Sequence, residues 1–249
     1  MRKIVVNPKY ETLRSYLEGI PERMLLEGTV LYNRRNLIKE LITPDGLHIN
    51  VKRYQKPSYN SIVYSLGIRK PKGQRAYEYP FILKKRGINT PESIAYIEDR
   101  KMGVLQYSYF ISIQAQGYHL LFEDNSTEKV TSEELALALA SFTADMHKKG
   151  VLHKDYSPNN ILYKVKDGIY DFTIVDINRM RFGPVDMKTG CRNFVHLWGP
   201  KRFIVLLVES YARIRGFDAT TCVHNALEAR RRFWIKFLKR HQVDYDLEL

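Results

Sequence analysis

Alternating apolar and polar positions dominate residues 24–54 and predict β-strands there. The clearest pair covers residues 37–43 and 47–54, with Asp45-Gly46 between them. Because an Asp-Gly pair readily adopts the positive φ angles of a tight turn, this stretch predicts a β-hairpin. Residues 1–20 carry a short helical pattern instead.

Further along the chain, apolar residues recur mainly at helical spacing. Gly87 directly follows the first helical segment, and its missing Cβ suits the left-handed C-terminal cap of a helix. Thr131 or Ser132 can cap the N-terminus of the second. Helices are predicted over residues 74–86, 132–147, 202–215 and 219–240, and strands over residues 94–97 and 104–113.

The order of these elements predicts two lobes in an α+β fold. The first half of the chain holds mostly strands and one helix, and the second holds mostly helices around one short hairpin. The character changes between residues 114 and 125. We therefore expect an N-terminal lobe at residues 1–118 and a C-terminal lobe at residues 119–249.

The charge of the chain points to an anionic partner. Its 249 residues carry a formal net charge of +13, and no apolar run approaches the roughly 20 residues of a membrane-spanning helix. Such a surface suits a phosphorylated substrate, an anionic membrane face or nucleic acid, although a solvated basic surface without a dedicated partner stays open. Cys191 and Cys222 lack metal-ligand spacing, so we interpret them as packing residues in a reducing, cytosolic compartment.

The most informative segment is residues 151–163, where His153, Asp155 and Asn160 follow the spacing His-x-Asp-x-x-x-x-Asn. This spacing matches the catalytic loop of protein kinases. It predicts Asp155 as the catalytic base that orients a hydroxyl, Asn160 as a magnesium ligand, and His153 as either catalytic or structural. By contrast, His119, His196 and His224 have no partner spacing and read as ordinary polar residues.

A second predicted hairpin follows this loop, and Asp176 lies just past its return strand. A kinase places at this point the Asp that bridges magnesium to the β- and γ-phosphates. Asp171 precedes Phe172 and superficially resembles the Asp-Phe-Gly motif, but it falls inside the strand. We therefore assign the metal-binding role to Asp176.

The first half of the chain should supply the groups that hold ATP. Lys52 lies on a predicted strand, and Glu78 lies on the following predicted helix. A strand lysine held by a helix glutamate contacts the α- and β-phosphates in kinases. A full glycine-rich loop is absent, and only Gly28 stands near the expected turn. Arg34-Arg35 either cover phosphates in its place or are simply charges at a hairpin tip.

Together these residues resemble the protein-kinase-like superfamily, and within it the bacterial lipopolysaccharide kinases that phosphorylate heptose or Kdo of the inner core. The resemblance runs from about Leu26 to Leu197 and includes Gly87-Ile88-Asn89-Thr90-Pro91 and Val175-Asp176-Ile177-Asn178-Arg179. It implies a bilobal protein-kinase-like fold, the cofactors ATP and Mg²⁺, and transfer of the γ-phosphate to a sugar hydroxyl. The implied partner is an anionic glycolipid, with no nucleic acid and no obligate protein partner expected.

The same resemblance implies a cytoplasmic protein that contacts the inner face of the inner membrane. The helix at 219–240 is basic and aromatic, so it either lies on anionic lipid or packs its aromatic face on the lobe. Two rival functions stay open: a kinase for another small molecule or a protein, and a pseudokinase that acts as a binding module. Acceptor screening separates the first, and the intact Lys52, Asp155, Asn160 and Asp176 argue against the second.

Overall fold

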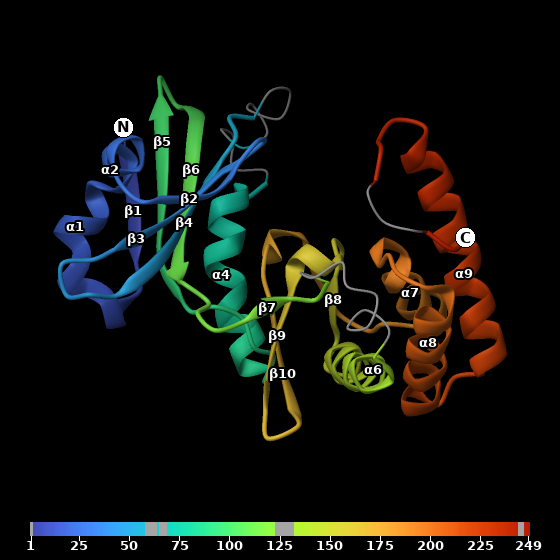
Figure 1. The fold of residues 1–249 in the computed structure, drawn as a ribbon. Coiled ribbons are helices and arrows are strands. Elements are labelled where there is room, and N and C mark those ends of the chain that lie inside the picture. Colours follow the sequence, from blue (N-terminus) through green and yellow to red (C-terminus); the bar gives the residue numbers. More distant parts are fainter. Residues whose placement is uncertain (1, 58–63, 65–68, 123–131, 244–246) are drawn as a thin grey trace. The chain divides into compact units, whose positions relative to one another are not determined.

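The computed structural model describes the whole chain except residues 1, 58–63, 65–68, 123–131 and 244–246. The chain divides into two compact units, Met1–Gln116 and Gly117–Leu249 (Figure 1). Each unit has its own hydrophobic core.

Unit 1 is built on a six-stranded antiparallel sheet with the strand order β1-β5-β6-β4-β3-β2. The predicted hairpin is confirmed, because β3 and β4 pair antiparallel in register from Leu37 with Arg53 to Ile42 with His48. The strands are β1 (Arg2–Val6), β2 (Thr29–Asn33), β3 (Leu37–Ile42), β4 (His48–Tyr54), β5 (Ser93–Lys101) and β6 (Val104–Ile113).

Short helices cover one face of this sheet. They are a 3₁₀-helix at Pro8–Leu13, α1 (Arg14–Glu18) and α2 (Ile20–Leu26). Ile20 and Met24, four residues apart on α2, are both buried in the core that the helices form with the sheet. The prediction that strands begin at residue 24 is therefore wrong at its start, and the helical pattern of residues 1–20 missed β1.

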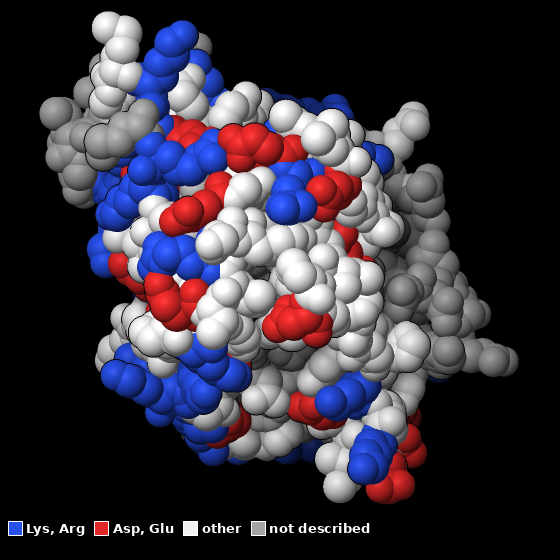
Figure 2. Space-filling model, turned by 90° about the vertical axis from the view of Figure 1, so that its left-hand side faces the viewer, with Lys and Arg blue, Asp and Glu red and all other residues white. Residues whose placement is uncertain are grey.

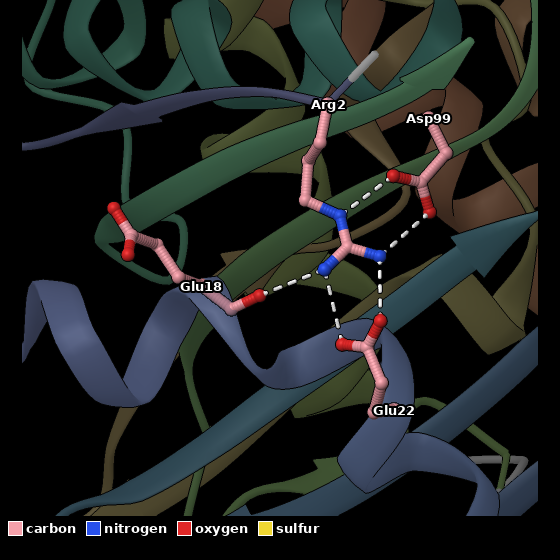
Figure 3. A network of polar contacts seen from close by, with 4 residues as sticks. All are labelled: Arg2, Glu18, Glu22 and Asp99. Carbon is pink, nitrogen blue, oxygen red and sulfur yellow. Dashed lines mark hydrogen bonds and ion pairs between the residues drawn. The ribbon is translucent and has the colours of Figure 1, made fainter.

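Arg2 explains why the chain opens with a strand (Figure 3). From β1 its guanidinium donates to Asp99 on β5 and to Glu22 on α2, at 2.7 Å each, and to the carbonyl of Glu18 at 3.1 Å. These ion pairs raise the pKa of the Arg2 guanidinium. One side chain thus ties the first strand to both the sheet and its covering helices.

Helix α4 (Lys72–Lys85) packs on the opposite face of the sheet. The hydroxyl of Ser93 on β5 donates to the carbonyl of Tyr77 on α4 at 2.8 Å. The helix ends as predicted, with Gly87 at a φ of 65°. Lys52 pairs with Phe110, and Phe110 with Tyr96, so these three residues lie in a row on the face that α4 covers.

Among its described residues, unit 2 contains short strands and four α-helices of different lengths. They are β7 (His119–Leu120), α6 (Glu133–Lys148), β8 (Val151–His153), β9 (Ile161–Lys166), β10 (Ile169–Ile174), β11 (Met180–Phe182), α7 (Met187–Arg192), α8 (Lys201–Arg215) and α9 (Ala219–Leu238). Of the two predicted caps, Ser132 caps α6, since its hydroxyl accepts from the Leu135 N–H at 3.2 Å, and Thr131 lies outside the described residues. The predicted α+β fold is confirmed.

Cys191 on α7 and Cys222 on α9 form a disulfide, with their Cα atoms 5.5 Å apart and both side chains buried. The interpretation of two separate packing residues is wrong, because the fold brings residues 31 positions apart into contact. Disulfides are rare in a reducing cytosol, so the compartment stays a prediction.

The structure also shows where the aromatic and basic residues of α9 lie. Trp234 is buried, and Phe233 packs edge-to-face on His196 with their centroids 4.7 Å apart, so this aromatic face packs on its own unit. Arg230, a basic residue of α9, is not at the surface. It is buried instead, and its guanidinium donates to the carbonyls of Leu197 and Gly199.

Two surface properties bear on the expected partners. No helix within the described part of the chain is long and apolar enough to cross a bilayer. On the face shown in Figure 2, acidic side chains lie among the basic ones. The net charge of +13 therefore does not appear there as one continuous basic field.

Candidate active site

The predicted catalytic loop leaves β8 and passes through a 3₁₀-turn at Pro158–Asn160 into β9. His153 ends β8 and is buried. Its Nδ1 accepts from the Asp155 N–H at 3.1 Å, so its Nε2 carries the proton and donates to the carbonyl of Val175 at 2.9 Å. Burial lowers the pKa of the imidazole, which keeps it neutral. These contacts hold the backbone in place on both sides of His153. They support a structural role for this residue.

Asn160 connects the loop to the second predicted hairpin. Its Nδ2 donates to the carbonyl of Asp155 at 2.8 Å, and its own carbonyl accepts from the Val175 N–H at 3.0 Å. Because β9 pairs with β10 up to Ile161 and Ile174, Asp176 emerges directly beside this connection. The fold thus gathers Asp155, Asn160 and Asp176 at one end of the hairpin.

The backbone of Asp176 adopts an unusual conformation. Its φ and ψ are 53° and 43°, a left-handed conformation that few residues other than glycine adopt. Asn178 donates from Nδ2 to its Oδ1. Asp171, by contrast, lies within β10, accepts from the Tyr118 hydroxyl at 2.8 Å and pairs with Lys164 at 3.2 Å. Its rejection as the metal ligand agrees with these contacts.

The donor set at this end of the hairpin fits magnesium. Mg²⁺ binds through one or two carboxylates together with phosphate and water oxygens. Asp176 supplies a carboxylate, and Asn160 supplies an amide oxygen. Since Nδ2 of Asn160 is held by the Asp155 carbonyl, its Oδ1 faces the other way. These two residues would hold the ion.

A buried relay beneath the loop was not predicted. The Arg215 guanidinium donates to the Tyr211 hydroxyl at 3.2 Å, and that hydroxyl lies 2.9 Å from Nδ1 of His147. Nε2 of His147 donates to Oδ1 of Asn193 at 3.0 Å, and Nδ2 of Asn193 donates to the His153 carbonyl at 2.9 Å. Burial lowers the pKa of His147 to about 4, which suits the neutral form that this chain of bonds requires.

Two further side chains lie close to Asp155. Arg179 Nη1 is 3.8 Å from Asp155 Oδ2, and both side chains remain partly exposed. Burial lowers the pKa of His196, and the negative charge of Asp155 opposes that shift. His196 had no partner by spacing, because its neighbours come from segments about 20 to 40 residues away in sequence.

The residues expected to hold ATP lie in unit 1. Lys52 is buried on the α4 face of the sheet, with its ammonium 5.4 Å from the centre of the Tyr54 ring. Glu78 accepts from Lys70 Nζ at 2.7 Å and from Gln74 Nε2 at 2.9 Å. Both oxygens of Glu78 thus have partners on or before its own helix, and its pairing with Lys52 stays a prediction.

Gly28 does not stand at the turn where it was expected. It directly precedes β2, whereas the tip of the β2–β3 hairpin is at residues 34–36. Gly28 has a φ of 85°, and a Cβ there would lie 2.6 Å from the Glu40 carbonyl oxygen. Glycine is therefore required for the close approach of β3. Arg34 and Arg35 occupy the tip and are exposed, which leaves their two interpretations open.

Comparison with known proteins identifies the fold. No family model matches the chain, and no curated protein matches its sequence.

Solved structures do match. WaaP in complex with acyl carrier protein matches with a TM-score of 0.60 at 15% identity, over 96% of this chain and 100% of that one. The Rio2 kinase–ADP/Mg²⁺–phosphoaspartate complex from Chaetomium thermophilum matches with a TM-score of 0.51 at 14% identity, over 88% of this chain and 75% of that one. The chain therefore has the protein-kinase-like fold, of the form that it shares with WaaP.

Proposed function

We propose that this protein is an ATP-dependent kinase that transfers the γ-phosphate of ATP to a sugar hydroxyl of the lipopolysaccharide inner core. The observation that carries the proposal is the position of Asn160. Through its side chain it holds the Asp155 carbonyl, and through its backbone it holds the segment that ends in Asp176. These are the three residues that the kinase reaction requires from this unit.

In the proposed reaction Asp155 orients the acceptor hydroxyl and takes its proton as the oxygen bonds to the γ-phosphorus. The bond to the β-phosphate oxygen breaks, and ADP leaves. Asp176 and Asn160 would hold magnesium, and the bound ion would neutralise charge on the phosphates. Arg179 pairs loosely with Asp155 and keeps a positive charge beside the reacting carboxylate.

Unit 1 would contribute Lys52, which would hold the α- and β-phosphates. A nucleotide phosphate is a suitable partner for a lysine ammonium. Glu78 would brace Lys52 once its bonds to Lys70 and Gln74 exchange. Gly28 has no part in the proposal, because its conformation serves the packing of β2 on β3.

The sugar acceptor is proposed from three observations. The sequence resembles lipopolysaccharide kinases, the fold matches that of WaaP, and the net charge of +13 favours a polyanionic glycolipid. Such a substrate would place the protein at the cytoplasmic face of the inner membrane. WaaP was solved together with acyl carrier protein, so the expectation of no obligate protein partner is not supported, and copurification should be checked.

The experiment is transfer of labelled phosphate from Mg-ATP to Kdo-bearing lipid A, comparing the wild type with Asp155→Asn. We expect label in the glycolipid with the wild type only, and equal nucleotide binding by both proteins. A fully active Asp155→Asn protein would refute the assignment of the base. Nucleotide binding without transfer would direct the search to other hydroxyl acceptors, and no nucleotide binding would favour the pseudokinase alternative.

A further inference from the structure

A cavity of about 370 Å³ lies in unit 2. One wall comes from α7 and the turn that follows it, and the other comes from α9, which contacts both (Figure 1). The lining residues are Arg192, Val195, His224, Asn225, Glu228, Ala229 and Arg232.

The α9 wall follows from helical periodicity. Residues 225, 228, 229 and 232 recur at intervals of three and four, so they form one stripe along the helix. The disulfide anchors the two walls, because Cys191 precedes Arg192 and Cys222 lies two residues before His224. The spacing between Arg192 and the α9 stripe is therefore fixed covalently.

The chemistry of the lining favours an anion that carries hydroxyl groups. Two guanidinium groups and one imidazole face a single carboxylate, Glu228, which is already paired with Arg232. Guanidinium groups bind phosphate and carboxylate oxygens in a fork geometry. Asn225 and Glu228 add the amide and carboxylate groups that bond sugar hydroxyls.

Residues 193–196 connect the cavity to the proposed reaction centre along the chain, since Asn193 donates to the His153 carbonyl and Val195 lines the cavity. Val195 lines the cavity, whereas its neighbour His196 packs on Phe233 of α9. The negative charge of Asp155 acts to raise the pKa of His196. A sugar bound in the cavity and a hydroxyl at Asp155 would thus lie on either side of the same short turn.

We propose that this cavity binds an oxyanion on the acceptor, a phosphate or carboxylate of a sugar adjacent to the one that is phosphorylated. The proposal deepens the proposed function and rests on it. It assigns Arg192 and Arg232 as specificity-determining residues, and it predicts that acceptors without this charge bind weakly.

The first test is a binding titration that needs neither ATP nor transfer. Glucose 6-phosphate, glucuronate and glucose are added separately to the intact protein, and the imidazole signal of His224 is followed by NMR. We expect either or both of the charged sugars to bind at least about tenfold more tightly than glucose. The stronger of the two identifies the anion. Equal binding of all three sugars would overturn the proposal.

Matched variants locate the site. Arg192→Gln and Arg232→Gln should each weaken binding of the charged sugar by about tenfold. Arg231→Gln removes the same charge from the neighbouring exposed position of α9, outside the lining, and should leave binding unchanged. Glu228→Gln should strengthen binding several-fold, because it removes the one negative charge of the lining. A stronger anion complex cannot result from a damaged fold, so this variant keeps the test decisive.

A second arm separates this proposal from the proposed function. In transfer assays Arg192→Gln and Arg232→Gln should raise the KM for the glycolipid with little change in kcat. Transfer by the wild type with no effect of either variant on KM would overturn the cavity as an acceptor site and leave the kinase assignment intact. Charged-sugar binding without any transfer would refute the proposed function and, with it, the link between the cavity and an acceptor.

Discussion

The side-chain amide of Asn193 donates a hydrogen bond to the backbone carbonyl of His153, 2.9 Å away. Because His153 in turn holds the backbone at Asp155 and Val175, Asn193 connects the turn after α7 to both sides of the proposed catalytic site. The bond also orients the Asn193 side chain so that its Oδ1 lies 3.0 Å from Nε2 of His147. Several consequences of this geometry can be measured.

Asn193→Ala should lower kcat while nucleotide affinity changes less than about twofold. The substitution leaves the His153 carbonyl and His147 Nε2 without their partner, which should cost about 1–3 kcal/mol of folding free energy. Nucleotide binding by titration and turnover in the transfer assay separate the two effects. Asn193→Asp, which keeps the acceptor oxygen but loses the donor, should be impaired as well. Full activity of both variants would exclude a positioning role for Asn193.

Folding stability should fall between about pH 6.5 and pH 4. Burial lowers the pKa of His147 to about 4, so the unfolded chain takes up this proton before the folded protein does. The stability from a neutral His147 is complete above pH 6.5 and is lost as the pH falls through the folded value, by at most about 3 kcal/mol. His153 acts in the same direction.

Urea unfolding at a series of pH values measures this dependence. A His147→Gln variant keeps a polar side chain without a titrating group, so its stability should vary less over the same range. An identical pH profile for the variant and the wild type would contradict the assignment to His147.

Removing the disulfide should destabilise unit 2. The bond between Cys191 and Cys222 closes a loop with a sequence separation of 31, which corresponds to about 3–4 kcal/mol of loop entropy in the unfolded chain. Melting curves with and without dithiothreitol measure the effect. A Cys191→Ala, Cys222→Ala protein supplies the control, because its melting temperature should be low and insensitive to the reductant. If reductant leaves the wild-type melting temperature unchanged, the bond does not contribute as proposed.

Gly28→Ala should destabilise the fold more than Gly46→Ala does. Both glycines have positive φ, 85° and 83°, but a Cβ at Gly28 would approach the Glu40 carbonyl oxygen to 2.6 Å, whereas nothing lies within 4 Å at Gly46. We expect losses of about 2–4 and about 1 kcal/mol respectively. Nucleotide affinity of the folded proteins should stay unchanged in both. A selective loss of nucleotide binding in Gly28→Ala would return Gly28 to the phosphate site.

Glu78→Gln should weaken binding of Mg-ATP by about tenfold if Glu78 braces Lys52 as proposed, because the buried ammonium would lose a charged partner. Lys70→Gln removes the present partner of Glu78 and should leave nucleotide affinity unchanged or slightly improved. Equal affinity in the Glu78→Gln and wild-type proteins would limit Glu78 to its contact with Lys70.

Local patterns in the sequence were enough to predict the α+β fold, the β3–β4 hairpin, α4 and α6, because periodicity, turn residues and caps act over a few neighbouring positions. They also pointed to Asp155, Asn160 and Asp176, whose proposed roles depend on a loop and a hairpin that are contiguous in the chain. The tertiary structure alone decided the contacts made across long separations. Arg2 joins three segments, Cys191 meets Cys222, and Asn193 reaches His153 from 40 residues away. No local pattern specifies such pairs, since they form only when packing of whole helices and strands brings their side chains together.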